Sequence, residues 1–214
     1  MRDWGVASLP TTDQAAPRRG RPGYTREQVL DVAVALFNER GYDATSVSDL
    51  AERLGVSKSA LYHHFASREE LLDLAVDHAL AGLEQLLDQP GATSGAPIDR
   101  LRFVLAGAVH VLVERLPSVT LLLNVRSNSD VERRALERRR DFDHRVTALM
   151  QAAQDAGEVR ADVSGAVATR LLFGMVNSLT EWYRPGGDID ADTLAADILH
   201  VALDGLGRPV DGQS

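Results

Sequence analysis

Apolar residues recur every three or four positions in each segment between the glycine and proline breaks of the chain, and this helical period constrains the fold more than any other feature. The breaks fall at 17–23, 89–97, 185–187 and 205–212. No segment alternates apolar and polar residues as a half-buried strand does. Because 44% of the 214 residues are hydrophobic, the helices have enough apolar surface to form a core. The sequence therefore predicts an all-α fold.

Four helices are predicted in the first 88 residues, and each opens at a hydroxyl residue that can cap it. They begin at Thr25, Ser46, Ser57 and Ser67 and extend to about residues 40, 54, 65 and 88. Segment 89–97 (QPGATSGAP) is expected to be a flexible connection, because it is small, polar and contains prolines. Beyond it we expect helices at about 98–116, 118–126, 130–156, 163–184 and 190–206.

The short second and third helices, joined by a turn that contains Gly55, have the spacing of a helix-turn-helix. A helix that enters the major groove of DNA needs short or hydrogen-bonding side chains outside and apolar ones inside. Residues 57–65 fit this requirement, since Ser57 and Lys58 fall outward while Leu61 and Phe65 fall inward. An ordinary helical hairpin at a bundle corner has the same spacing, and the spacing alone leaves both interpretations open.

The charge distribution is uneven along the chain. The formal net charge is −8, yet residues 17–68 hold eight basic and six acidic side chains, so the excess acid lies downstream. A locally basic segment joined to an acidic one is typical of a DNA-binding head with a separate regulatory part. A solvated surface without such a role shows the same asymmetry.

Residues 45–71, TSVSDLAERLGVSKSALYHHFASREEL, resemble the DNA-binding segment of TetR-family transcriptional regulators. The resemblance covers about residues 24–72, and the chain length and helical remainder are also similar to the family. Ser59 stands where glycine is frequent in the family, and Arg68 where lysine is frequent. The resemblance implies an N-terminal three-helix helix-turn-helix domain, joined by a long helix to a C-terminal helical ligand-binding and dimerisation domain.

The resemblance also divides the chain and assigns its DNA contacts. It implies a flexible basic arm at 1–23, the DNA-binding domain at 24–70, the ligand-binding and dimerisation domain at 71–208 and a disordered tail at 209–214. The implied phosphate contacts are Thr45, Ser46, Tyr62 and Arg68. The implied contacts to base edges are Ser57, Lys58, Ser59 and His63. The arm residues Arg18, Arg19 and Arg21 are implied to reach the minor groove or backbone, with a solvated tail as the alternative.

Polar or aromatic residues that interrupt apolar helix faces are the candidates for an effector pocket. They are Phe103, His110, Asn124, Arg126, Phe142, Arg170, Phe173, Asn177 and Trp182. Ordinary core packing is the alternative for the phenylalanines, and an ordinary hydrogen-bonded helix position is the alternative for His110.

The run 181–187 (EWYRPGG) resembles TetR-family regulators of fatty-acid, steroid-ring and phenylacetate catabolism, many of which sense acyl-CoA thioesters. This resemblance implies an elongated apolar pocket, with Arg102, Arg126 or Arg170 meeting the phosphates of the CoA. Simple helix termination by the proline and glycines is the alternative.

The predicted function is that of a ligand-responsive repressor. It binds a palindromic double-stranded DNA operator as a homodimer, through helices at about 163–184 and 190–206, and is released by a small hydrophobic effector such as an acyl-CoA thioester. Two-fold symmetry would place the recognition helices about 34–36 Å apart. The alternative is an α-helical small-molecule-binding or interaction protein without sequence-specific DNA binding.

No reactive constellation points to an enzyme. The sequence has no Gly-rich phosphate loop followed by Lys-Ser/Thr, no Gly-x-Ser-x-Gly and no His-Glu-x-x-His. Cysteine is absent, and the adjacent His63 and His64 point about 100° apart on a helix, so neither a cofactor nor a metal site is expected. Without a signal-like apolar run in residues 1–16 or an apolar stretch of bilayer length, we expect a cytoplasmic protein that does not enter the membrane.

Overall fold

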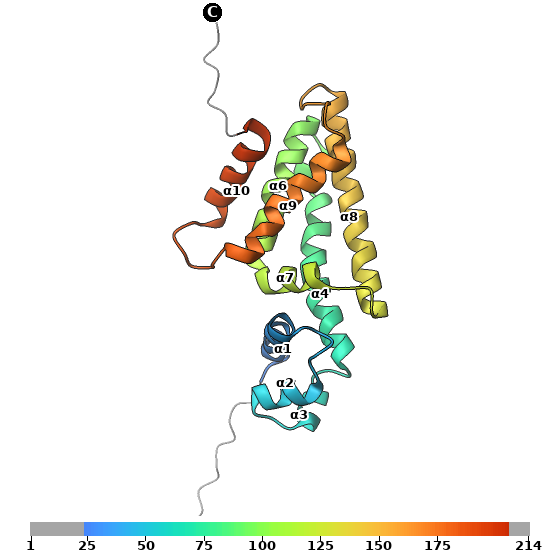
Figure 1. The fold of residues 1–214 in the computed structure, drawn as a ribbon, viewed down its shortest axis with the longest axis vertical. Helices are drawn as coiled ribbons and strands as arrows, with labels where there is room; N and C mark the ends of the chain where they lie inside the picture. Colours follow the sequence, from blue (N-terminus) through green and yellow to red (C-terminus); the bar gives the residue numbers. More distant parts are fainter. Residues whose placement is uncertain (1–23, 206–214) are drawn as a thin grey trace, which may run out of the picture.

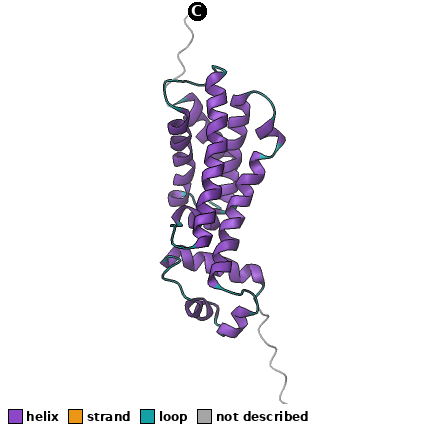
Figure 2. Cartoon of the chain, turned by 90° about the vertical axis from the view of Figure 1, so that its right-hand side faces the viewer, coloured by secondary structure: helices purple, strands orange, loops and turns teal. Residues whose placement is uncertain are grey.

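The computed structural model describes residues 24–205, which form helices and connecting turns with no strand in that range (Figures 1 and 2). A small head at one end contains α1 (Arg26–Arg40), α2 (Val47–Leu54) and α3 (Lys58–Tyr62). The long helix α4 (Arg68–Leu87) runs from the head into a larger body. The body also contains α5 (Pro90–Thr93), α6 (Pro97–Glu114), α7 (Leu116–Asn124), α8 (Asp130–Asp155), α9 (Gly165–Trp182), α10 (Ala191–Leu199) and the π-helical turn η1 (His200–Asp204). The all-α prediction is confirmed.

Side-chain caps start the helices of the head where the sequence predicts them. Thr25 and Ser46 form capping boxes with Gln28 and Asp49, and Ser57 and Ser67 accept backbone N–H groups at the starts of α3 and α4. These interactions are local in sequence, which is why the starts of all four helices could be predicted.

Two segments differ from their predicted structure. The third helix ends at Tyr62 rather than Phe65, and residues 63–65 form a turn in which the N–H groups of His64 and Phe65 both donate to the Leu61 carbonyl. Segment 89–97 is not an open connection, since α5 forms within it and Ala92 is buried. Gly91 lies so close to the Phe103 ring that an added Cβ would be 2.5 Å from it, so small residues here permit packing instead of flexibility.

The α4 helix joins the two parts of the core. Leu72 and Leu80 on α4 are fully buried in a cluster that includes apolar residues of α1 in the head and α7 in the body. Leu86 on α4 belongs to a second cluster, with apolar residues of α6, α8 and α9. On its other side α4 carries a row of acidic residues that pair with arginines of α8. The pairs are Asp73 with Arg134, Asp77 and Glu84 with Arg138, and Asp88 with Arg145. Apolar packing and this row together fix α4 against the body.

Within the described range no single helix combines the length and apolarity needed to cross a bilayer. Helices α6 and α7 reach that combination only when taken together, and they are bent by 101° at their junction.

Candidate functional site

The first turn of α3 presents its side chains to solvent while its other face is anchored in the head. The Ser57 hydroxyl accepts the Ala60 N–H at 3.2 Å, and Lys58 and Ser59 are exposed beside it. On the inner face Leu61 is 5% exposed, and Phe65, just beyond the helix, is 4% exposed. The separation of a polar outer face from an apolar inner face, predicted from the sequence, is confirmed.

The turn between α2 and α3 fixes the angle between these two helices. Gly55 adopts the left-handed conformation, with φ 66° and ψ 34°. Its N–H donates to the carbonyls of Ala51 and Glu52, and the Val56 N–H donates to the Ala51 carbonyl at 3.0 Å. Because a residue with a Cβ is strained in this conformation, glycine at position 55 sets the geometry of the two helices.

Tyr62 and His63 continue the exposed surface at the end of α3. Tyr62 is 55% exposed although it is a large aromatic residue, and His63 is exposed next to it. His64 is half-buried, with its ring 6.5 Å from that of Phe65. The structure thus places Ser57, Lys58, Ser59, Tyr62 and His63 at exposed positions around the buried Leu61.

Thr45 and Ser46 have different environments although they are adjacent. The Thr45 side chain is buried; its hydroxyl donates to the Gly41 carbonyl at 2.8 Å, and its N–H donates to the Tyr42 carbonyl at 3.1 Å. In the structure Thr45 therefore has no free donor for a phosphate, and a phosphate contact by this residue stays a prediction. Ser46 is exposed at the start of α2, and its hydroxyl and N–H hold the pKa of Asp49 below its usual range.

Arg68 holds the loop between α1 and α2. One of its terminal nitrogens donates to the carbonyls of Thr45 at 2.7 Å and Tyr42 at 3.1 Å, and its guanidinium lies 4.2 Å from the centre of the Tyr42 ring. A phosphate contact by Arg68 stays a prediction. Arg18, Arg19 and Arg21 lie outside the described residues, so their predicted contacts are not addressed by the structure.

The residues predicted to bind an effector are distributed over several parts of the body. Phe142 and Phe173 pack edge to face with their centroids 5.4 Å apart, and Arg170 and Asn177 lie one turn to either side of Phe173 on α9. Asn124 and Arg126 line a cavity next to the head.

The remaining three effector candidates lie apart from those groups. Phe103 packs on Gly91, the His110 ring lies 3.4 Å from the Asp192 carboxylate, and Trp182 is half exposed. The nine residues therefore do not line one common cavity, and their contact with an effector stays a prediction.

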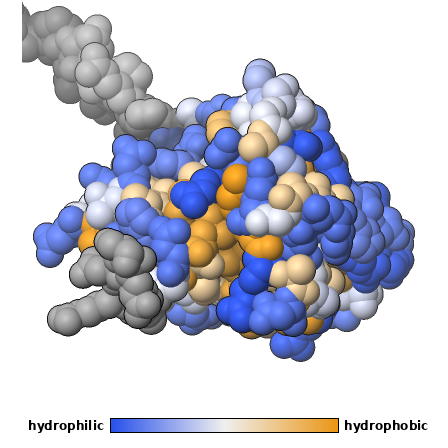
Figure 3. Space-filling view, turned by 90° about the horizontal axis from the view of Figure 1, so that it is seen from above, coloured by the Kyte–Doolittle hydropathy of each residue, from blue (hydrophilic) through white to orange (hydrophobic). Residues whose placement is uncertain are grey.

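A cavity of about 540 Å³ lies at the end of the body farthest from the head. Its lining comes from α6, α8, α9, η1 and the loop after α8, and the charged residues on its wall are Arg102, Arg160, Glu158 and Asp204. The Arg102 guanidinium lies 3.9 Å from the Asp204 carboxylate, and Arg160 donates to Asp162 at 2.6 Å. The apolar residues are Ile98, Met150, Val159, Val163, Ala168, Leu171, Leu172, Met175, Val201, Ala202 and Leu203. Seen from this end, apolar side chains surround a hollow with a hydrophilic rim (Figure 3).

This cavity was not predicted from the sequence. Helices at about 163–184 and 190–206, which contain Leu171, Met175 and Val201, were predicted to form the dimer interface, and polar or aromatic residues were predicted to contact the effector. The helical period indicates that residues such as Leu171 and Met175 share a face, but it does not indicate which helix that face meets. Of the three arginines considered for CoA phosphates, only Arg102 lines this cavity.

The outer face of α9 carries uncovered apolar residues. Leu172, Val176 and Leu179 point into the body, whereas Leu171 is 63% exposed and Val167 is 48% exposed. Helix α10 packs mainly on α6 (Figure 1), and Val201 beyond it is also exposed. The described residues contain no group of three or more His, Asp or Glu arranged to hold a metal ion.

Two short helices, α2 and α3, joined by the Gly55 turn in a three-helix head define the helix-turn-helix class of proteins. Residues 29–75 match the bacterial regulatory proteins of the tetR family, and residues 94–206 match the tetracyclin repressor-like C-terminal domain. The chain belongs to the TetR family of transcriptional regulators.

Individual relatives cover nearly the whole chain. The HTH-type transcriptional repressor KstR2 of Rhodococcus jostii (strain RHA1) is 30% identical over an alignment of 208 residues, which covers 94% of this chain and 98% of the relative. The crystal structure of SCO3833, a TetR-family member from Streptomyces coelicolor A3, is 47% identical with a TM-score of 0.82, covering 86% of this chain and 94% of that one. AibR, crystallised with isovaleryl coenzyme A and operator DNA, has the same fold at 22% identity and a TM-score of 0.68, covering 82% and 96%.

Proposed function

We propose that this TetR-family regulator is a repressor that binds a palindromic operator as a homodimer and is released by a hydrophobic acyl-CoA-type effector. The observation that carries the proposal is the first turn of α3, whose exposed Ser57, Lys58 and Ser59 stand on the buried Leu61. In this proposal these three side chains approach base edges together with His63, while Ser46, Tyr62 and Arg68 contact phosphates. Thr45 holds the loop that positions Ser46.

The exposed apolar face of α9 supports the homodimer. Exposed Leu171 and Val167 form an apolar surface that has no partner within the described chain. A two-fold interface through α9 and α10 buries this surface against its own copy and brings two heads into one particle. Replacing Leu171 by Glu should convert the dimer into a monomer in sedimentation experiments, whereas Arg140→Glu, also on an exposed position but on α8, should leave it dimeric.

The far cavity of the body supports a hydrophobic effector. Its apolar lining suits a hydrocarbon chain or ring system, and Arg102 on its wall can pair with a phosphate. The KstR2 relative is named as a repressor, and the structure of AibR contains a coenzyme A thioester together with operator DNA. These names suggest the effector class, and titration of the operator complex with acyl-CoA thioesters and the free acids tests it.

The single lysine of the chain permits a direct test of the DNA-binding face. Because Lys58 is the only lysine in the sequence, an amine-reactive acetylating reagent can modify no other side-chain amine. We expect DNA from the region upstream of the gene to protect Lys58 from acetylation, as measured by mass spectrometry, and unrelated DNA to protect it less at about 200 mM salt. Equal acetylation of Lys58 with and without bound operator would contradict the proposed orientation of α3.

A further inference from the structure

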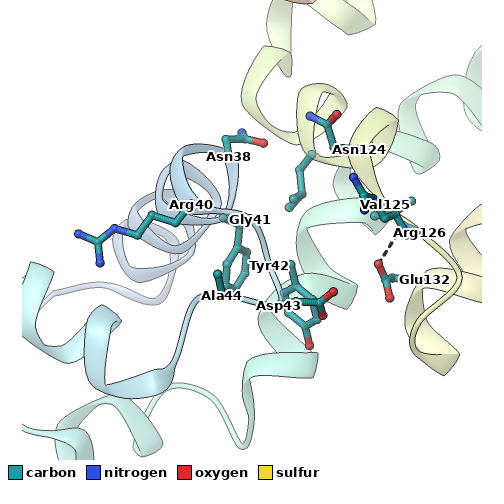
Figure 4. Close-up of a pocket in the computed structure, with 12 residues that line it drawn as sticks. Asn38, Arg40, Gly41, Tyr42, Asp43, Ala44, Asn124, Val125, Arg126 and Glu132 are labelled. Carbon is teal, nitrogen blue, oxygen red and sulfur yellow. Dashed lines mark hydrogen bonds between the residues drawn. The ribbon is translucent and has the colours of Figure 1, made fainter.

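A second cavity, of about 380 Å³, lies between the head and the body (Figure 4). The head contributes the end of α1 and the loop after it, and the body contributes the end of α7 and the loop before α8. The far cavity described above shares none of these residues. A ligand in the interdomain cavity would touch both parts of the molecule.

The wall on the body side is held in place by a buried carboxylate. Glu132 is 3% exposed, and its oxygens accept the N–H groups of Arg126 at 2.9 Å and Asn128 at 3.1 Å. The Ser129 hydroxyl donates to the same carboxylate at 3.0 Å. The charge of Glu132 is thus matched by donors of its own loop, and the loop before α8 has a fixed shape at the cavity.

Two hydrogen bonds hold the walls of the cavity together. The Asn128 side-chain amide donates to Asp43 at 2.8 Å, and the Asn38 side-chain amide donates to the Pro117 carbonyl at 2.8 Å. The second bond also fixes the orientation of Asn38, because a carbonyl can only accept. The Oδ1 atom of Asn38 is therefore the acceptor that remains.

Two polar groups at this cavity are buried without a hydrogen-bond partner among residues 24–205. They are Asn38 Oδ1 and the Tyr42 hydroxyl. The Asn124 and Arg126 side chains, which are exposed at the cavity, make no hydrogen bond or ion pair with other described residues. Figure 4 shows Asn38 and Asn124 on facing helices, with Arg126 on the loop after α7. Buried polar groups are normally satisfied, so the two buried groups without a partner indicate a bound polar molecule, to which the exposed Asn124 and Arg126 can donate.

We propose that the interdomain cavity binds a small hydroxy monocarboxylic acid. The carboxylate is held by Arg126 and Asn124, and the hydroxyl donates to Asn38 Oδ1. The apolar side chains of Phe37 and Leu121, which also line the cavity, contact the carbon skeleton. Asp43 and Glu132 stand nearby, and their negative charge disfavours a second carboxylate, which selects mono- over dicarboxylic acids.

This site gives the regulator a second input, independent of the effector cavity at the far end. The ligand contacts Asn38 in the head and Arg126 in the body, so its binding depends on how the head is oriented. Any orientation that operator DNA favours must change the affinity for the acid, and the acid must change the affinity for DNA by the same factor.

The direct test is calorimetric titration of the full chain, without DNA, with sodium 3-hydroxybutyrate and with butyrate. We expect the hydroxy acid to bind about 5-fold more tightly, because butyrate cannot donate to Asn38. The dicarboxylate succinate should bind more weakly than either. Absence of saturable binding of 3-hydroxybutyrate, or equal affinities for the two monocarboxylates, overturns the proposal and indicates that water fills the cavity.

Two variants complete the test. Arg126→Gln should weaken 3-hydroxybutyrate binding about 10-fold or more, since a charge-assisted contact is lost, whereas Arg140→Gln removes an exposed arginine of α8 and should change nothing. Saturating 3-hydroxybutyrate should alter operator affinity in the unmodified protein and not in Arg126→Gln. Unchanged 3-hydroxybutyrate affinity in Arg126→Gln contradicts the proposed site. Because this affinity is measured without DNA, such a result would leave the proposed repressor function untouched.

Discussion

The head and the body of this protein use their sequences differently. In the head the candidate DNA-binding face lies on residues 57–63, a single run next to one glycine turn. In the body the far cavity is lined from four separate helical segments and the loop after α8, between residues 98 and 204. A surface made by consecutive residues is visible in a sequence, whereas a cavity made by distant segments depends on how the helices pack.

Two helices of the body, α6 and α7, start without a side-chain cap, after Ala96 and Arg115. The helices of the head follow hydroxyl residues that cap them, and α8, α9 and α10 of the body are likewise capped by Ser129, Ser164 and Asp190. Both α6 and α7 have proline in their first turn, which tolerates the missing N–H. Burial of Leu101 and Leu105, rather than capping, therefore holds α6 in place.

The largest effect is expected in the head, from removal of two exposed side chains. The double change Lys58→Ala and Tyr62→Ala should weaken operator binding about 100-fold or more, because each contact contributes about 1–3 kcal/mol. Fluorescence anisotropy with labelled operator measures this loss, and circular dichroism should show unchanged helix content. Operator affinity equal to that of the unmodified protein would leave α3 without a role in DNA binding.

A substitution that creates a new cavity in the core of the body should lower the free energy of unfolding without affecting the DNA-binding face. Leu105 is 1% exposed, so Leu105→Ala should lower the free energy of unfolding by about 2–5 kcal/mol. Urea denaturation measures the change. Because Leu105 is far from α3, the folded fraction should keep its operator affinity within about 2-fold. A larger loss would show that packing in the body affects the DNA-binding face of the head.

The arginines that connect α4 to α8 should contribute less than the core. Arg138 hydrogen-bonds both oxygens of Glu84 at 2.8 and 2.7 Å and also Asp77 at 2.8 Å, whereas Arg134 contacts Asp73 alone at 3.1 Å. Arg138→Gln should therefore cost about 1 kcal/mol and the matched Arg134→Gln less than about 0.5 kcal/mol, since both sites are partly exposed and screened. Thermal unfolding at low and high salt tests the order, and the difference should shrink in high salt.

The smallest effect concerns the pH dependence of the body. Burial raises the pKa of Asp143, while the nearby Arg139, His144 and Arg170 act in the opposite direction. Because the pKa of Asp143 is raised in the folded state, ionised Asp143 destabilises the fold. This destabilisation is absent below the pKa of Asp143 in the unfolded chain and complete above its pKa in the folded protein. Asp143→Asn should stabilise the protein by less than about 1 kcal/mol at pH 7 and not at about pH 3, as measured by urea denaturation.

The predictions from the sequence succeeded where neighbouring residues decide the structure. Ser46 and Ser57 cap helices that Gly55 separates, so the helix-turn-helix could be located before any tertiary contact was known. Thr45 shows the limit within the head, because its burial depends on the fold of the loop against α4. In the body Phe103 packs against Gly91, in a segment expected to be flexible, and this contact between distant residues has no short-range signal in the sequence.

The sequence by itself determined that the chain is helical, where its first helices begin and which side of α3 is apolar, because capping, glycine turns and helical period act over three or four residues. Only the tertiary structure decided that Leu171 lines a cavity, that Asn124 and Arg126 meet the head, and that Asn38 keeps an unused acceptor between the two parts. The physical reason is that helix period specifies a face, while packing of all the helices together specifies what that face meets.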